Sequence, residues 1–168
     1  MSTIEINPGD ELLTKLAETM EIHFGEFEGI SAGRKSKTPF LINTRTVFGH
    51  PSTFRMLKRC LAEGALKFKE QPEQFVGISY SGVPLAVAIA DANSCAFSYY
   101  RKEQKKDALK NFHEGVDPAG KHAVLVDDTV VKGVKTERLY RNLLTLKPKS
   151  ISLLTVFRLC TAFILQCK

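Results

Sequence analysis

The chain has 168 residues, of which 43% are hydrophobic and 25% are charged, with a formal net charge of +6; these values predict one soluble globular domain. The four cysteines lack the spacing of a zinc site or a disulfide framework, and no segment has the roughly 18 apolar residues of a membrane span. We therefore expect a protein of the reducing cytoplasm, not exported and not bound to a membrane. The positive charge fits either nucleic acid or a small polyanionic substrate, and the distribution of the charges must decide between them.

The first predicted element is an amphipathic helix that follows a start signal at residues 5–10. Leu12, Leu16 and Met20 lie at helical spacing, and the helix is predicted to end near residues 23–25. Two short strands around a mobile basic loop at residues 31–37 are expected next.

A second helix is predicted from Pro51, because Leu57 and Leu61 lie on one apolar face of it. Basic residues such as Arg55 and Lys58 fall on the opposite face. That pattern is typical of a solvated surface.

From Gln74 onward, strands and helices alternate as in a doubly wound sheet. Residues 75–78 read as a short buried strand, a turn follows, and Pro84 occupies a plausible first position of a helix. Further strands are predicted at residues 95–100 and 150–157. An α/β fold is the expectation.

The stretch from His122 to Thr136 carries the strongest functional signal. Its apolar run ends in Asp127 and Asp128, passes through a turn that holds Gly133, and opens into a helix. Ligands of open parallel sheets lie outside the carboxyl ends of the strands, where a helix N-terminus can hold a phosphate. The two carboxylates are predicted to face the same crevice, where they can accept hydrogen bonds from sugar hydroxyls and help to hold Mg²⁺. An acidic turn after a buried strand is the alternative.

Two more segments point to the same edge of the sheet. The turn from Tyr80 to Gly82 is expected beside the aspartates if the crossovers are right-handed. The basic run 101–110 is either a solvated helix start, a nucleic-acid patch or a source of positive field for a polyphosphate. Tyr99 and Tyr100 precede this run without interleaving it, which favours a small anionic substrate over nucleic acid.

Several motifs occur here in an order and spacing that are more specific together than alone. They are residues 77–85, 101–105, 114–115, 124–128 and Gly133, with 24–27, 33–36 and 40–43 near the N-terminus. Together they resemble the orotate phosphoribosyltransferases of the type I fold over nearly the whole chain. The resemblance implies a central, mostly parallel sheet flanked by helices, in a single domain with an N-terminal helix and hood at 1–45 and an α/β core at 46–168.

The resemblance also implies an activity, which is the transfer of phosphoribose from phosphoribosyl pyrophosphate (PRPP) to orotate in pyrimidine biosynthesis. Its products are orotidine 5′-phosphate and pyrophosphate, and its cofactor is Mg²⁺, held through the substrate, with Asp127 and Asp128 as candidate ligands. The same two aspartates match the residues that bind the ribose hydroxyls. The 5′-phosphate loop is matched by Thr129, Val130, Val131, Lys132, Gly133, Val134 and Lys135.

The resemblance also implies residues that bind the pyrophosphate group of PRPP and the orotate ring. Tyr80 and Ser81 match the loop that binds pyrophosphate, whereas Leu41, Ile42 and Arg158 match the positions that hold orotate.

Lys105, with Arg101 and Lys102, matches a mobile catalytic loop that reaches the site of a partner subunit. The resemblance thus implies a homodimer.

The phosphate loop departs from the family pattern, because valines and lysines stand where hydroxyl side chains are usual. Ile30 and Asp107 also differ from common family residues, and the chain ends at Lys168, short of the family's C-terminal strand and helix. The alternative function is therefore a catalytically weak protein of the same fold that binds PRPP or a nucleotide as a sensor or regulator. The retained basic residues of the catalytic loop favour chemistry.

Overall fold

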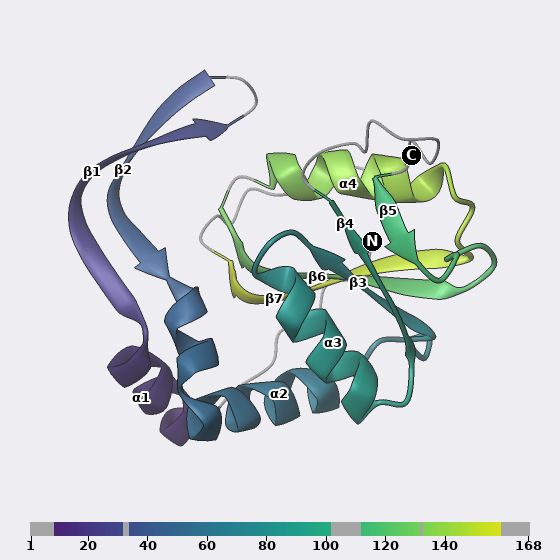
Figure 1. Cartoon of the computed structure of the whole chain (residues 1–168), viewed down its shortest axis with the longest axis horizontal. Coiled ribbons are helices and arrows are strands. Elements are labelled where there is room, and N and C mark those ends of the chain that lie inside the picture. Colours follow the sequence, from purple (N-terminus) through teal and green to yellow (C-terminus); the bar gives the residue numbers. More distant parts are fainter. Residues whose placement is uncertain (1–8, 32–33, 102–111, 132, 159–168) are drawn as a thin grey trace.

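The computed structural model describes residues 9–31, 34–101, 112–131 and 133–158. They form an α/β body from which a two-stranded arm stands out (Figure 1). The elements, in chain order, are α1 (Gly9–Thr19), β1 (Glu21–Ser31), β2 (Arg34–Asn43), the 3₁₀ helix η1 (Thr44–Gly49), α2 (Pro51–Ala65), β3 (Gln74–Ile78), α3 (Gly82–Ala92), β4 (Ala96–Tyr100), β5 (His113–Gly115), β6 (His122–Val130), α4 (Val134–Leu144) and β7 (Ser150–Arg158).

The body is built on a five-stranded sheet with the order β5-β4-β3-β6-β7. Strands β4, β3, β6 and β7 are parallel, and only β5 runs antiparallel to its neighbour. The predicted mostly parallel sheet is thus confirmed. The three-residue strand β5 was not predicted, because so short a strand leaves no periodic signal.

Helices cover both faces of this sheet. Alternate residues of a strand point to opposite faces, so Val124 and Val126 pack in the core with α1, α2 and α3, whereas Ala123 and Leu125 pack in the core with α4. All four side chains are fully buried. Figure 1 shows the same layers, with α2 and α3 on one side of the strands and α4 on the other.

The predicted end of the first helix was wrong. Helix α1 ends at Thr19, and His23 and Phe24 already belong to β1. In the antiparallel register Phe24 lies opposite Phe40 and His23 opposite Leu41, so cross-strand pairing overrides the helical spacing that continued to this point.

The arm also differs from the expected short strands around a basic loop. Strands β1 and β2 have 11 and 10 residues, and basic residues 34–37 are part of β2. In the register Glu28 pairs with Lys37, and the Lys37 Nζ lies 2.7 Å from Glu26 Oε2. Residues 32–33 lie outside the described part of the chain.

Two further observations concern the cysteines and the length of the helices. Cys60 and Cys95 are free thiols. Among the described residues, none of the helices combines the length and the apolar composition that crossing a membrane requires.

Candidate functional site

The carboxyl ends of β3 and β6 bring two loops to one edge of the sheet. The two strands are adjacent and parallel, and helix α3 begins directly after β3 and its turn. A Cβ atom at Gly77 would lie 2.7 Å from Val83 Cα, and one at Gly82 would overlap the carbonyl oxygen of Val126. Because both residues are glycines, the N-terminus of α3 can rest on the strand ends, and the turn that holds Tyr80 lies beside the aspartate strand.

The second loop is shorter than the sequence predicted. Thr129 and Val130 belong to β6, since the strand continues to pair with Phe157 and Arg158 of β7. Helix α4 begins at Val134 instead of Thr136.

Gly133 makes this short connection possible. Its φ of 68° lies in the left-handed region, which glycine adopts without a steric penalty. The β-branched Val134 is the first residue of the helix and avoids that region. The first turn of α4, with its unpaired backbone N–H groups, therefore points to the edge of the sheet where an anion would be bound.

Asp127 and Asp128 point to opposite faces of the sheet, as neighbouring residues of a strand do. Asp127 Oδ2 lies 3.6 Å from the Lys135 Nζ at the start of α4, and its Oδ1 accepts a hydrogen bond of 3.1 Å from the Asp128 backbone N–H. Asp128 instead accepts a hydrogen bond from the Thr44 hydroxyl. The expectation that both side chains face one crevice was therefore wrong.

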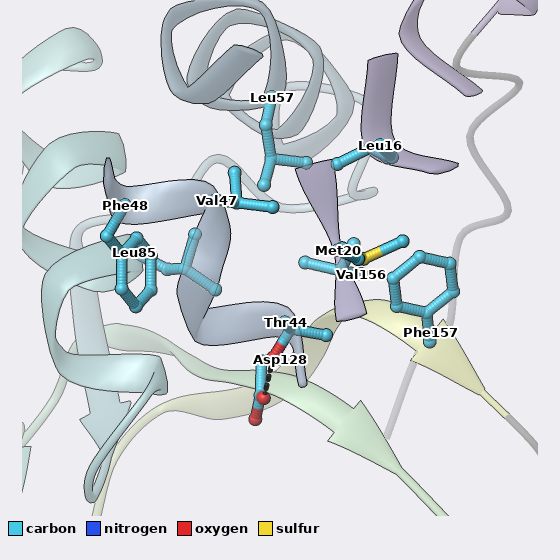
Figure 2. A pocket seen from close by; sticks show the side chains of 10 residues that line it. All are labelled: Leu16, Met20, Thr44, Val47, Phe48, Leu57, Leu85, Asp128, Val156 and Phe157. Carbon is cyan, nitrogen blue, oxygen red and sulfur yellow. Dashed lines mark hydrogen bonds between the residues drawn. The ribbon is translucent and has the colours of Figure 1, made fainter. Parts of the chain in front are cut away.

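Figure 2 shows the surroundings of Asp128. Its carboxylate and the Thr44 hydroxyl are the polar groups of a small pocket whose other lining residues are apolar: Leu16, Met20, Val47, Phe48, Leu57, Leu85, Val156 and Phe157. Thr44 directly follows the last residue of β2. The base of the arm is thereby joined to the aspartate strand, a contact that sequence reasoning missed because 84 residues separate its two members.

Asp127 is buried, with 3% of its surface exposed. Burial raises the pKa of its carboxyl to about 7; the charge of Lys135 opposes this rise and that of Asp128 adds to it. Asp127 therefore carries a proton about half of the time at neutral pH.

We expect Asp127→Asn to remove a pH dependence of stability. The pKa is about 7 in the folded protein and close to 3.8 in the unfolded chain, so the folded state binds the proton more tightly. The free energy of unfolding of the wild type should then fall as the pH rises from 4 to 7, by roughly 4 kcal/mol at most. Chemical denaturation of the wild type and of Asp127→Asn between pH 4 and pH 7 tests whether only the wild type loses stability in this way.

The control for this series is Asp91→Asn, which changes an exposed carboxylate paired with Lys58 at 3.0 Å. Exposed pairs contribute little to stability, so this variant should follow the wild type. An Asp127→Asn variant that also follows the wild type would contradict the assignment.

The other predicted site residues lie in three places. Tyr80 is 67% exposed at the edge of the sheet, and Ser81 is buried at the N-cap of α3. Arg101 forms an ion pair with Glu114, with 3.0 Å between Nη1 and Oε1, so the strand ends of β4 and β5 are tied together. Val131 is exposed after β6. Lys102, Lys105 and Lys132 lie outside the described residues.

Leu41, Ile42 and Arg158 are not all in one place. Leu41 and Ile42 lie near the base of the arm, where Ile42 pairs with Ile22. Arg158 ends β7 and pairs with Val130, so it lies at the same sheet edge as the aspartates.

The described residues contain no group of three or more histidine, cysteine or carboxylate side chains placed to hold a metal ion.

The sequence is similar to that of proteins of known function. Residues 45–159 match the model of the phosphoribosyl transferase domain. Orotate phosphoribosyltransferase of Pyrobaculum islandicum is 30% identical over 122 residues, which are 73% of this chain and 61% of that protein. The enzyme of the same name from Methanoculleus marisnigri is 30% identical over 128 residues, 76% of this chain and 68% of that protein.

Solved structures agree on the fold. The crystal structure of orotate phosphoribosyltransferase from Aeropyrum pernix superposes with a TM-score of 0.65 and 21% identity, over 89% of this chain and 92% of that one. The chain spans only 61% of the length of its Pyrobaculum islandicum relative.

Proposed function

Because this chain belongs to the phosphoribosyltransferase family, and within it to the orotate phosphoribosyltransferases, we propose that it transfers phosphoribose from PRPP to orotate. The products are orotidine 5′-phosphate and pyrophosphate. One observation carries the proposal: the turn after β3, the aspartates of β6 and the N-terminus of α4 meet at one edge of the sheet.

Each part of this edge suits one part of PRPP. The first turn of α4 offers backbone N–H groups to the 5′-phosphate, and Lys135 adds a positive charge in the same turn. Asp128 accepts hydrogen bonds from the ribose hydroxyls, with Thr44 holding its carboxylate in place. Tyr80 and Ser81, in the turn before α3, would contact the pyrophosphate.

The chemistry requires charge stabilisation on the leaving group. The bond between the ribose C1 and pyrophosphate breaks as a nitrogen of orotate forms the new bond, and negative charge grows on the pyrophosphate. Arg101, Lys102 and Lys105 follow β4 and would neutralise that charge. Because such contacts strengthen only as the bond breaks, they accelerate the reaction.

Mg²⁺ fits this site through the substrate. Carboxylates and phosphate oxygens are its preferred ligands, and Asp127 and Asp128 supply the only carboxylates of the strand. When bound, Mg²⁺ would offset the charge of the pyrophosphate. Asp127, whose pKa is raised to about 7 by burial, would lose its proton more readily beside the ion.

We further propose a cytoplasmic homodimer in which Lys105 acts at the partner's site. A two-fold dimer is the commonest closed arrangement of identical chains. The free thiols of Cys60 and Cys95 fit a reducing compartment.

Asp128→Asn tests the site directly. We expect PRPP binding to weaken by about 1–3 kcal/mol, because a charged acceptor of hydrogen bonds is lost. Isothermal titration calorimetry measures the change. Asp10→Asn, an exposed carboxylate of α1, is the control and should bind as the wild type does. Unchanged affinity in Asp128→Asn would contradict a role of this carboxylate in PRPP binding.

A further inference from the structure

A hydrogen bond joins the base of the arm to the aspartate strand. The Thr44 hydroxyl, at the start of η1, donates to Asp128 Oδ2 of β6 (Figure 2). Thr44 is 6% exposed, and the other residues that line the pocket around the contact are apolar. Because a hydrogen bond in apolar surroundings is stronger than one in water, this contact holds the two segments firmly together.

Each end of the contact lies beside one substrate of the function proposed above, on which this inference rests. Leu41 and Ile42, just before Thr44 in the chain, match the positions that hold orotate, whereas Asp128 is proposed to bind the ribose of PRPP. A carboxylate can accept about four hydrogen bonds. Asp128, which is half-buried, can therefore accept from a ribose hydroxyl while Thr44 donates to it.

The position of the orotate residues depends on how the base of the arm is held. Strands β1 and β2 form a sheet of two strands, and Figure 1 shows this arm standing out from the body. A hairpin of two strands is only marginally stable by itself, so the contacts at its base decide how firmly it is oriented. There Asn43 Nδ2 donates to Glu21 Oε2 at 2.8 Å, which ties β2 to β1, and Thr44 ties β2 to Asp128.

The backbone of Asp128 is held more firmly than its carboxylate. Strand β6 is paired with β7 on either side of this residue. The Asp128 N–H donates to Asp127 Oδ1 at 3.1 Å, and its carbonyl oxygen accepts from the Thr155 hydroxyl at 3.3 Å. The carboxylate can turn about its last side-chain bond, whose torsion has a broad preference. A ribose hydroxyl bonded to the carboxylate would fix this rotation, and with it the Thr44 hydroxyl.

We propose that the Thr44–Asp128 hydrogen bond couples the binding of the two substrates, with Thr44 as a positioning residue. When PRPP fixes the Asp128 carboxylate, Thr44 and the end of β2 are ordered before orotate arrives. Orotate binding then costs less conformational entropy, so orotate binds more tightly. Because such coupling is reciprocal, orotate strengthens the binding of PRPP by the same factor.

Ribose 5-phosphate is the probe that tests this coupling in the full chain. It has the phosphate and the hydroxyls of PRPP but no pyrophosphate to lose, so its mixture with orotate does not react. Isothermal titration calorimetry of orotate, with and without saturating ribose 5-phosphate, gives the coupling as the ratio of two dissociation constants. We expect the wild type to bind orotate about fivefold or more tightly in the presence of ribose 5-phosphate, and Thr44→Val to lower this ratio to about 1.

Two further variants separate the role of the hydroxyl from a structural effect. Valine has nearly the shape of threonine and suits the apolar lining of the pocket, so Thr44→Val should stay folded, which urea denaturation checks. Thr44→Ser keeps the hydroxyl and should restore the coupling. Thr46→Val removes a neighbouring hydroxyl of η1 that donates to the Asn43 carbonyl oxygen at 2.9 Å, and it should keep the ratio of the wild type.

The coupling is overturned if the wild type binds orotate equally well with and without ribose 5-phosphate. A Thr44→Val variant that keeps the wild-type ratio would also overturn it, as would an equal loss of coupling in Thr46→Val. In these outcomes both ligands bind, so the proposed function stands. If neither orotate nor ribose 5-phosphate binds to the wild type, the proposed function is wrong as well.

Discussion

Lys105→Ala is expected to lower kcat by about 100-fold or more while PRPP binding stays nearly unchanged. The reason is that Lys105 is proposed to act on charge that appears only as pyrophosphate leaves, and removing one such contact typically costs about 100- to 1,000-fold in rate. Steady-state kinetics with calorimetry of PRPP binding separates the two quantities. Lys67→Ala, an exposed lysine that follows α2, is the control.

The same variant separates an enzyme from a binding protein of this fold. If the chain only binds PRPP or a nucleotide, Lys105 touches the polyanion in the ground state. Its loss would then weaken binding in a salt-dependent way, and there would be no turnover to lose.

Mixing two variants of impaired activity tests whether Lys105 serves the partner's site. In a dimer of one Lys105→Ala chain and one Asp128→Asn chain, one of the two sites would regain both residues. We expect activity to return on mixing. No gain of activity on mixing two folded variants that exchange subunits would contradict a shared site, as would a monomer in sedimentation that is fully active.

Gly82→Ala is expected to cost about 3 kcal/mol of stability and to abolish tight PRPP binding. The added Cβ would overlap the carbonyl oxygen of Val126, and because that atom is backbone of a central strand, α3 has to move away from β6. Overpacking of this kind usually costs about 1–3 kcal/mol, and here it also displaces the turn that holds Tyr80. Urea denaturation and calorimetry measure the two effects.

The matched control is Gly49→Ala. A Cβ atom there would have nothing within 4 Å, so stability and binding should stay near those of the wild type. If Gly82→Ala were as stable as Gly49→Ala, the close approach of α3 to β6 would be wrong.

Most strands of the central sheet could be predicted from the sequence alone. Strands β3, β6 and β7 lie within a few residues of the predicted limits, because buried strands of a parallel sheet are rich in apolar residues. The position of the aspartates at the same sheet edge as the Tyr80 turn was also predicted, since right-handed crossovers allow few arrangements of the strands. The ends of the helices were predicted less accurately. Helix α1 stops at Thr19 because the next residues pair in β1, and helix α4 starts at Val134 because Gly133 adopts the left-handed conformation.

The contacts between side chains of the site could not be predicted from the sequence. Alternation along β6 sends Asp127 toward Lys135 and Asp128 toward Thr44, and that direction depends on where the strand ends relative to its neighbours. The Thr44–Asp128 hydrogen bond and the edge-to-face contact of the Tyr100 and His113 rings join residues from different elements. No local pattern predicts such contacts, because they form only when the sheet order and the packing of the helices bring those elements together.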